Sequence, residues 1–391
     1  MKKYTLHNRD IILLSNQMFH DRYWTSKQYI TMELIKNNRV LYIEGNYSIG
    51  KLVSGLFKRT WPVKPFGYMT QERENLFILT PFPRIPLRNH FRLFGWLNQK
   101  LLLFKIRRAG KKLKMKNPVF WTFLHQSADL VDKLDESLSI YHCVDDWPER
   151  FVMMNMGRRQ VIKTDEETIL GKTDLIISVS PGLLSDYKIE QSKFKIIENG
   201  VDLKMFKTQG SELQIPFDLN TIVKPIIGFA GSIGKWIDLD LYKYLLKNIP
   251  DYSFVMIGLN ERKKEIALCE QHNNFYYLGL KSQHDVPKYI NGFDVCLMPF
   301  NQTRIAKSLL PQKMFQYLAM GKPVVSSFIP TLEPFKDILY IAENPEQFGA
   351  CIQKAVIKNQ VLIQDRINFA EQYDWKNRMI KYESALSDIH N

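Results

Sequence analysis

Short apolar runs alternate with amphipathic segments along the first half of the chain. The segment at 26–38 has the apolar spacing of a helix. The apolar runs have the length and composition of buried strands and lie at residues 10–16, 39–45, 75–81, 118–125, 138–145, 174–180 and 194–200. Buried strands separated by helices are typical of a doubly wound parallel sheet, so the pattern predicts an α/β fold.

The same alternation restarts after a polar segment, 207–224, whose composition predicts a linker. The strands expected beyond it are 225–232, 252–258, 275–279, 294–300, 322–327 and 339–344. We therefore expect two Rossmann-like domains, 1–206 and 225–365. The C-terminal helix expected over 366–391 is a candidate for crossing back to the first domain. Open parallel sheets bind ligands beyond the carboxyl ends of their strands, so two such domains facing a cleft predict a ligand site there.

The charge of the chain is concentrated in one segment. The formal net charge is +14, and 45% of the residues are hydrophobic, which is ordinary for a soluble globular protein. Residues 51–120 hold 16 Lys and Arg against two acids, Glu72 and Glu74. The four cysteines are scattered without a C-x-x-C pair, which favours a reducing compartment over a disulfide framework or a zinc site. No apolar run is long enough to predict a signal peptide or a membrane span.

A glycine-rich turn, GFAGSIGKW at 228–236, follows the first strand of the second half. Gly231 would let backbone N–H groups approach a phosphate, and the N-terminus of a following helix would add positive potential. The glycines match neither G-x-G-x-x-G nor a P-loop, so the turn predicts no dinucleotide fingerprint. A plain tight turn is the alternative interpretation.

The segment PQKMFQYLAMGKPVVS, 311–326, predicts a helix that ends at a glycine and is followed by a strand. Lys313 and Gln316 share one face of that helix because they are three residues apart. A lysine there would neutralise a diphosphate, and a glutamine amide would hydrogen-bond ribose hydroxyls or a phosphate oxygen. A solvated helix face is the alternative.

The second half resembles glycosyltransferases of the GT-B fold. The resemblance rests on IIENGVD (196–202), GFAGSI, the segment 275–300 and KMFQYLAMGKPVVSS (313–327). Retaining members usually carry two glutamates eight residues apart, where this chain has Ser308 and Gln316. The Lys-x-x-Gln pattern instead resembles the glucuronosyltransferase of xanthan assembly, in which both side chains contact the donor. The resemblance implies a donor site made of Asn199, Gly231, Ser232, Gln312, Lys313 and Gln316.

The first half is similar to teichuronic-acid-type transferases through SKQYITMELIKNNRVLYIEG (26–45) and YHCVDDWPERF (141–151). Asp145 and Asp146 follow an expected strand at its carboxyl edge. The xanthan-type enzymes have an aspartate base in the matching region, which implies that Asp145 accepts the proton of the acceptor hydroxyl. Asp146 is expected to cap the next helix. His142 is the alternative base, although strand alternation places it on the opposite face from Asp145.

Two further motifs concern the acceptor and a metal. The segment FHDRYW (19–24) lies where GT-B acceptors bind, so His20, Arg22 and Trp24 are acceptor candidates. Trp24 would stack on a sugar ring or simply pack against its neighbours. The segment DLD (238–240) resembles the D-x-D metal motif of another glycosyltransferase fold, but it lies at an expected helix start, where carboxylates favour the dipole. We expect no metal and no cofactor beyond the nucleotide-sugar donor, for which a UDP-sugar is favoured.

Residues 86–116 combine aromatic and aliphatic side chains with dense Lys and Arg. Basic amphipathic helices of this kind lie on anionic membrane surfaces. A core-facing helix with a solvated basic side is the alternative, and the chain has no recognisable nucleic-acid module. The residues expected to contact a membrane are Phe91, Phe94, Trp96, Arg107, Arg108, Lys111 and Lys112.

These patterns together predict a hexosyltransferase-type enzyme of cell-surface polysaccharide biosynthesis, cytoplasmic and peripheral on the inner face of the cell membrane. It would move a sugar from a nucleotide diphosphate to a lipid-linked or glycan acceptor. The missing glutamate pair and the presence of Asp145 favour inversion. A sugar-nucleotide 2-epimerase of the same fold and a non-catalytic, membrane-docked partner protein are the alternative hypotheses.

Overall fold

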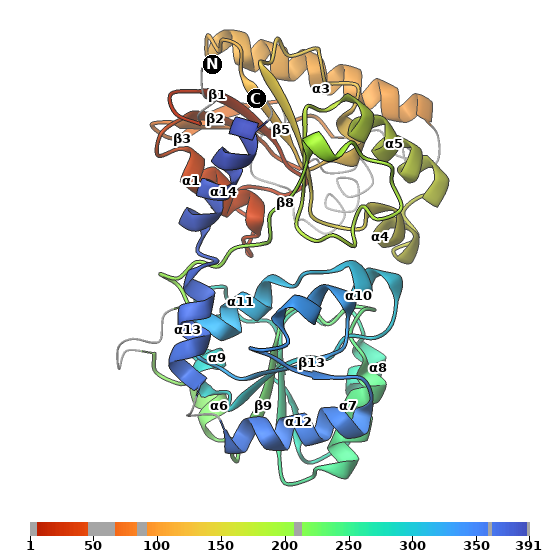
Figure 1. Ribbon diagram of the computed structural model, residues 1–391, viewed down its shortest axis with the longest axis vertical. Coiled ribbons are helices and arrows are strands. Elements are labelled where there is room, and N and C mark those ends of the chain that lie inside the picture. Colours follow the sequence, from red (N-terminus) through yellow and green to blue (C-terminus); the bar gives the residue numbers. More distant parts are fainter. Residues whose placement is uncertain (1–5, 46–66, 84–91, 207–212, 359–361, 389–391) are drawn as a thin grey trace, which may run out of the picture. The chain divides into compact units, whose positions relative to one another are not determined.

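The computed structural model describes residues 6–45, 67–83, 92–206, 213–358 and 362–388. The chain divides into two compact units (Figure 1). The first comprises Met1–Glu198 and Met379–Asn391, and the second comprises Asn199–Arg378. The division after Glu198 precedes the segment 207–224 that was expected as a linker, of which 207–212 lie outside the described residues.

The first unit contains an eight-stranded sheet in the order β3-β4-β2-β1-β5-β6-β7-β8. All neighbouring pairs are parallel except β3 and β4. Its strands are β1 (Asp10–Leu14), β2 (Arg39–Ile43), β3 (Met69–Arg73), β4 (Leu76–Leu79), β5 (Val119–Thr122), β6 (Leu138–Cys143), β7 (Leu175–Ser178) and β8 (Phe194–Ile196). Only β3 was not expected from the sequence, because this edge strand, MTQER, is polar and largely exposed.

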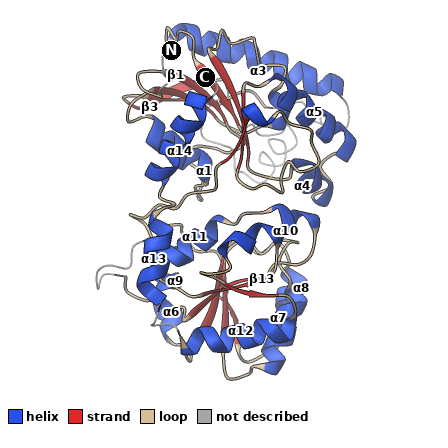
Figure 2. Cartoon of the chain, viewed as in Figure 1, coloured by secondary structure: helices blue, strands red, loops and turns tan. Residues whose placement is uncertain are grey.

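Helices lie on both sides of this sheet (Figure 2). They are α1 (Ser26–Leu34), α3 (Arg92–Lys112), α4 (Trp147–Met153), α5 (Arg159–Lys172) and α14 (Trp375–Ser387), the last of which begins in the second unit, and short 3₁₀ turns lie at His125–Ser127 and Gln191–Lys193. The long helix α3 packs Leu102, Leu103 and Ile106 against buried side chains of β1 and β2. This apolar stripe holds the basic segment of the chain on the sheet.

The second unit contains a six-stranded parallel sheet in the order β11-β10-β9-β12-β13-β14. Its strands are β9 (Ile226–Ala230), β10 (Ser253–Ile257), β11 (Phe275–Tyr277), β12 (Val295–Met298), β13 (Val324–Ser327) and β14 (Tyr340–Ala342). Its helices are α6 (Phe217–Asn220), α7 (Leu239–Asn248), α8 (Lys263–Cys269), α9 (Val286–Gly292), α10 (Arg304–Ser308), α11 (Gln312–Ala319), α12 (Pro345–Ile357) and α13 (Ile363–Glu371), with a 3₁₀ turn at Pro330–Phe335. The prediction of two doubly wound α/β domains is confirmed.

Candidate functional site

Three strand ends of the second unit meet through their backbones. The N–H of Gly231, after β9, donates to the carbonyl of Ile257 at 2.9 Å, and the N–H of Gly258, after β10, donates to the carbonyl of Gly279 at 2.9 Å. A Cβ on Gly258 would lie 2.0 Å from the Gly231 carbonyl oxygen, and both glycines have positive φ, 153° and 134°. Side chains are therefore excluded from this turn, because backbone and Lys313 atoms occupy the space that a Cβ would need.

Helix α11 is tied to the same strand end through Tyr317. The N–H of Ala230 donates to the Tyr317 hydroxyl at 2.9 Å, and this hydroxyl donates to the Ala230 carbonyl at 3.2 Å. One helical turn earlier, Lys313 lies beside Gly231, where a Cβ would come within 2.4 Å of the Lys313 Nζ. This Nζ is 3.9 Å from the centre of the Phe229 ring. The structure thus brings together the glycine turn and the lysine that the sequence singled out separately.

The ammonium of Lys313 has no carboxylate partner among the described residues. The side chain is half-buried, and removal of its head group from water lowers the pKa of Lys313 to about 7. An anion bound at this turn would counter the desolvation and restore the charged form. The arrangement is therefore suited to a phosphate group. When no anion is bound, Lys313 is only partly protonated near pH 7.

The other predicted donor residues differ in their surroundings. The side chain of Asn199 donates to the Leu310 carbonyl at 3.2 Å, which holds the loop that leads into α11. The buried Nε2 of Gln312 has no hydrogen-bond partner within the described residues. Gln316 and Ser232 are half-buried. Ser308, where retaining relatives carry a glutamate, is buried and donates to the Ile305 carbonyl at 3.0 Å.

The two aspartates of the first unit have different surroundings. Asp145 follows the carboxyl end of β6 and accepts from Nη1 of Arg150 at 2.8 Å. Lys27, which is buried on α1, interacts electrostatically with Asp145, and burial lowers the pKa of this lysine to about 8 while the aspartate opposes the shift. Asp146 caps α4, because its Oδ1 accepts from the Glu149 N–H at 3.2 Å. The capping role predicted for Asp146 is confirmed.

His142 belongs to the core of the first unit. Its side chain has no exposed surface and stacks on Phe123 with the ring centres 4.9 Å apart. Burial, together with the charge of Lys27, lowers the pKa of His142 to about 3. A side chain that no acceptor hydroxyl can reach cannot serve as the base, so this alternative is wrong.

The predicted acceptor residues make contacts within their own unit. His20 lies 3.1 Å from a carboxylate oxygen of Glu72, and the Arg22 guanidinium lies 6.0 Å from the centre of the Tyr23 ring. Trp24 packs against Phe19 at 5.8 Å and against Tyr29 at 5.5 Å, between ring centres. These contacts agree with the packing interpretation of Trp24, and the acceptor role of all three residues stays a prediction.

The D-x-D segment has a structural role. Asp238 caps α7 by accepting from the Leu241 N–H at 2.9 Å, and Asp240 pairs with Lys243 at 2.8 Å. Within the part of the chain that the structure describes, no three His, Cys, Asp or Glu side chains gather as metal ligands would. The carboxylates of this segment are therefore explained by the start of the helix.

Helix α3 has one buried stripe and one exposed face. Of the residues expected at a membrane, Phe91 lies outside the described residues, Phe94 is half-buried, and Trp96 and the four basic residues are exposed. Leu101 and Phe104 of the same segment are 49% and 60% exposed on this face, and the sequence interpretation missed Leu93, which is 65% exposed. None of the described helices is long and apolar enough to cross a membrane. We call Leu93, Trp96, Leu101, Phe104, Arg107, Arg108, Lys111 and Lys112 the basic apolar face of α3.

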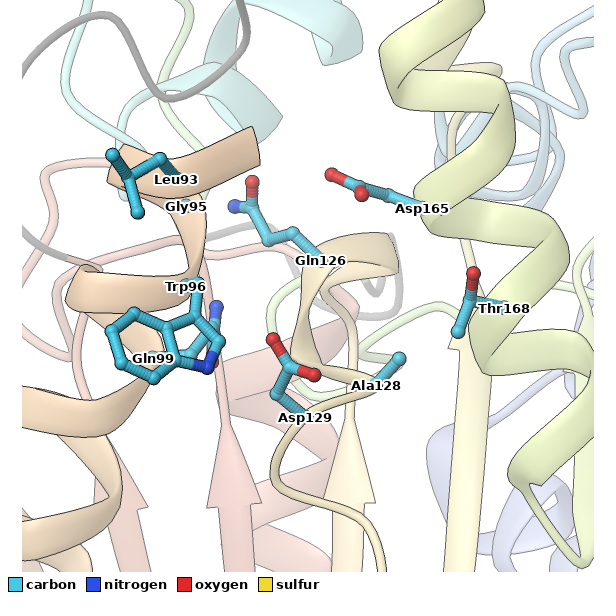
Figure 3. A pocket seen from close by; sticks show the side chains of 9 residues that line it. All are labelled: Leu93, Gly95, Trp96, Gln99, Gln126, Ala128, Asp129, Asp165 and Thr168. Carbon is cyan, nitrogen blue, oxygen red and sulfur yellow. The ribbon is translucent and has the colours of Figure 1, made fainter. Parts of the chain in front are cut away.

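A cavity in the first unit was also missed. It is lined by side chains from α3, from the 3₁₀ turn after β5 and from α5, including Trp96, Gln99, Gln126 and Asp165 (Figure 3). No motif marks it in the sequence, because its residues come from three separate segments. The signal in the sequence that could have indicated the cavity is a pair of glutamines on the buried side of their helices. Their residue type alone does not distinguish them from glutamines on the surface.

Comparisons with known proteins agree with this architecture. Residues 224–357 match the family described as glycosyl transferases group 1. The putative teichuronic acid biosynthesis glycosyltransferase TuaH of Bacillus subtilis (strain 168) is 28% identical over 264 residues, which cover 62% of this chain and 66% of that protein.

Solved structures resemble almost the whole chain. Sucrose-phosphate synthase of Thermosynechococcus elongatus has a TM-score of 0.71 at 15% identity, covering 96% of this chain and 98% of that one. HepE of Anabaena in complex with UDP-glucose has a TM-score of 0.66 at 14% identity, covering 97% and 99%. At this identity the likeness shows the fold. The chain has the GT-B fold, and its residues 224–357 match the glycosyl transferases group 1 family.

Proposed function

We propose that this protein transfers a sugar from a nucleotide diphosphate, with a UDP-sugar as the favoured donor, to a lipid-linked glycan of the cell surface. The observation that carries the proposal is the Lys313 ammonium, which lies against Gly231 and has no carboxylate partner among the described residues. The similar HepE structure, which contains UDP-glucose, supports the choice of donor.

The donor diphosphate would lie at the turn that follows β9, beside the start of α11. The missing side chain at Gly231 leaves room for the Lys313 head group, which supplies the positive charge. The N-terminus of α11 adds to the positive potential. Gln312 and Gln316 on the same helix would hydrogen-bond the donor, and Asn199 holds the preceding loop through Leu310. Lys313 and the dipole of α11 would offset part of the diphosphate charge, and we expect no metal at this site.

The transfer step uses Asp145 as general base. The acceptor oxygen forms a bond to the anomeric carbon, its proton passes to the Asp145 carboxylate, and the bond between that carbon and the diphosphate oxygen breaks. The negative charge that remains on the nucleoside diphosphate is stabilised by Lys313. Arg150 orients the carboxylate through its 2.8 Å ion pair. Direct displacement of this kind inverts the anomeric configuration.

The lipid-linked acceptor follows from the basic apolar face of α3. Exposed leucine, tryptophan and phenylalanine side chains would enter the interface of a membrane, while the Lys and Arg residues attract anionic headgroups. An enzyme bound in this way on the inner leaflet reaches sugars carried by lipid diphosphates. The teichuronic acid role in the name of the Bacillus subtilis relative is consistent with such an acceptor.

Product formation tests the function. The purified chain is incubated with radiolabelled UDP-glucose and lipids extracted from membranes of the producing organism, and label in the lipid fraction and released UDP are measured. We expect both from the wild type and a loss of about 100-fold or more for Asp145→Asn, as for removal of a general base. Unchanged transfer by Asp145→Asn would contradict the base assignment. An isomer formed from the donor alone would indicate an epimerase, and no UDP binding would indicate a non-catalytic partner protein.

A further inference from the structure

The cavity of the first unit has a volume of about 440 Å³. Its polar and aromatic lining consists of Trp96, Gln99, Gln126, Asp129, Asp165 and Thr168. It opens beside the carboxyl end of β5, because the turn that carries Gln126 follows this strand directly. Ligands of open parallel sheets bind at this edge. The volume is in the range of pockets for small organic ligands and far exceeds the space of a single ion.

Two buried amides in this cavity lack hydrogen-bond partners. Gln99 is 4% exposed and Gln126 is 6% exposed, and the Oε1 atom of each has no partner among the described residues. A buried carbonyl oxygen without a donor is costly, so such atoms are usually satisfied by protein or by ligand. Both side chains line the cavity, so a ligand that brings hydrogen-bond donors would satisfy them.

The other lining groups define the chemistry of that ligand. In Figure 3, the Asp165 carboxylate points from α5 towards the Gln126 amide, and the Asp129 carboxylate lies towards Trp96 and Gln99. Carboxylate and amide oxygens accept hydrogen bonds, and a polyol offers many hydroxyl donors. The indole of Trp96 adds a flat apolar surface for the C–H face of a ring. None of the described lining residues is a Lys or Arg, so the two carboxylates make this described lining negative, which disfavours phosphate and uronate groups.

We propose that this cavity binds a neutral sugar unit of the acceptor glycan. The inference rests on the proposed function and deepens it, since it names the acceptor-side subsite and the class of sugar that the site accepts. Leu93 and Trp96 belong both to the cavity lining and to the basic apolar face of α3. A glycan on a lipid carrier held at that face therefore has its sugars next to the cavity.

Saturation-transfer NMR on the full chain tests the proposal with methyl β-D-glucopyranoside and sodium glucuronate as probes. We expect transfer to the neutral sugar and a signal about fivefold weaker, or none, for glucuronate, because like charges repel. Gln126→Leu and Trp96→Ala are expected to reduce the neutral-sugar signal about fivefold or more, since each removes a contact to the ring or its hydroxyls. Phe104→Ala is the matched control, because this aromatic residue is exposed on the same helix outside the cavity.

A melting curve separates binding from folding. Gln126→Leu removes no hydrogen bond to another described residue, so its melting temperature should equal or exceed that of the wild type while sugar binding falls. Should Gln126→Leu or Trp96→Ala melt early, Asp129→Asn provides the second variant, which keeps the shape and is expected to raise the glucuronate signal about threefold by removing one charge.

Several outcomes would overturn the proposal. They are no transfer to the neutral sugar, equal transfer to glucuronate, undiminished transfer in Gln126→Leu and Trp96→Ala, or displacement of the sugar by calcium chloride, which would assign the oxygens to a cation. UDP-glucose binding is measured on the same samples. If the wild type does not bind UDP-glucose, the donor site is contradicted. If it binds UDP-glucose but not the neutral sugar, only the cavity proposal is contradicted.

Discussion

Binding of a nucleotide diphosphate should be accompanied by proton uptake at Lys313. In the free protein burial lowers the pKa of this lysine to about 7, because its ammonium packs against Phe229 and Gly231 and no described carboxylate faces it. At pH 8 such a lysine is protonated in about one molecule in eleven. A bound diphosphate favours the charged form and returns the pKa towards that of a free lysine. Each UDP-glucose bound at pH 8 should therefore take up about 0.9 proton.

Affinity follows the same protonation. The cationic form is the one that binds, so the dissociation constant should increase about 50-fold between pH 7 and pH 9, with a slope that approaches one decade per pH unit. UDP-glucose suits the measurement because its diphosphate is esterified at both ends and does not titrate in this range. Below pH 7 the lysine is largely charged before binding, so both proton uptake and the pH dependence should disappear.

Titration calorimetry measures the uptake. Binding enthalpies are recorded at pH 8 in HEPES, tricine and Tris, and the slope against buffer ionisation enthalpy equals the number of protons taken up. Lys313→Arg should bind without uptake, because a guanidinium stays charged. Lys313→Ala should bind weakly, and Lys247→Ala, an exposed lysine on α7, should behave as the wild type. Tight binding with zero slope in the wild type, or the same uptake in Lys313→Arg, would refute the assignment of Lys313 to the diphosphate.

Three further predictions follow from the structure. Phe104→Glu on α3 should weaken binding to phosphatidylglycerol vesicles in a flotation assay, and wild-type binding should fall with salt; equal flotation would contradict membrane contact. Gly258→Ala should lower the free energy of unfolding by about 2 kcal/mol or more and abolish UDP binding, because the new Cβ would clash with a carbonyl oxygen. Gly171→Ala in α5 is the control, since no atom lies near the new Cβ, and urea titrations should show it to be neutral or stabilising. Burial raises the pKa of Glu166 to about 7, so the stabilisation from its protonated form is complete below the unfolded pKa of 4.5 and is lost as pH rises through 7. The free energy of unfolding should fall by about 3 kcal/mol over this range, and Glu166→Gln should remove the dependence. A wild type with constant stability from pH 4.5 to 8 would contradict this prediction.

The order and type of the strands and helices can be predicted from the amino-acid sequence, since the local pattern of apolar residues carries that information. Buried parallel strands read as continuous apolar runs, so each strand except the polar edge strand β3 was located within a few residues. The sequence also predicts how residues that are close together along the chain are placed on one helix or at one strand end. Lys313 and Gln316 lie on one helix, Asp145 follows a strand end, and Asp146 caps the next helix as its type predicts.

Which of these residues lie in contact depends on how distant segments pack together. Lys313 reaches Gly231 because the Tyr317 hydroxyl ties α11 to the end of β9, a contact between distant segments that no local period encodes. Burial likewise removed His142 from the candidates, although histidine is a common base.

The two faces of α3 and the cavity beside it depend on the same kind of information. A helical pattern predicts that a helix has an apolar stripe, but α3 has apolar residues on more than one side. Packing against β1 and β2 buries Leu103 and leaves Phe104 exposed. The cavity joins side chains of α3, the turn after β5 and α5, and the buried amides of Gln99 and Gln126 meet there only once these elements pack. Sequence spacing specifies neighbours along one element, whereas such sites depend on the long-range contacts that place several elements together.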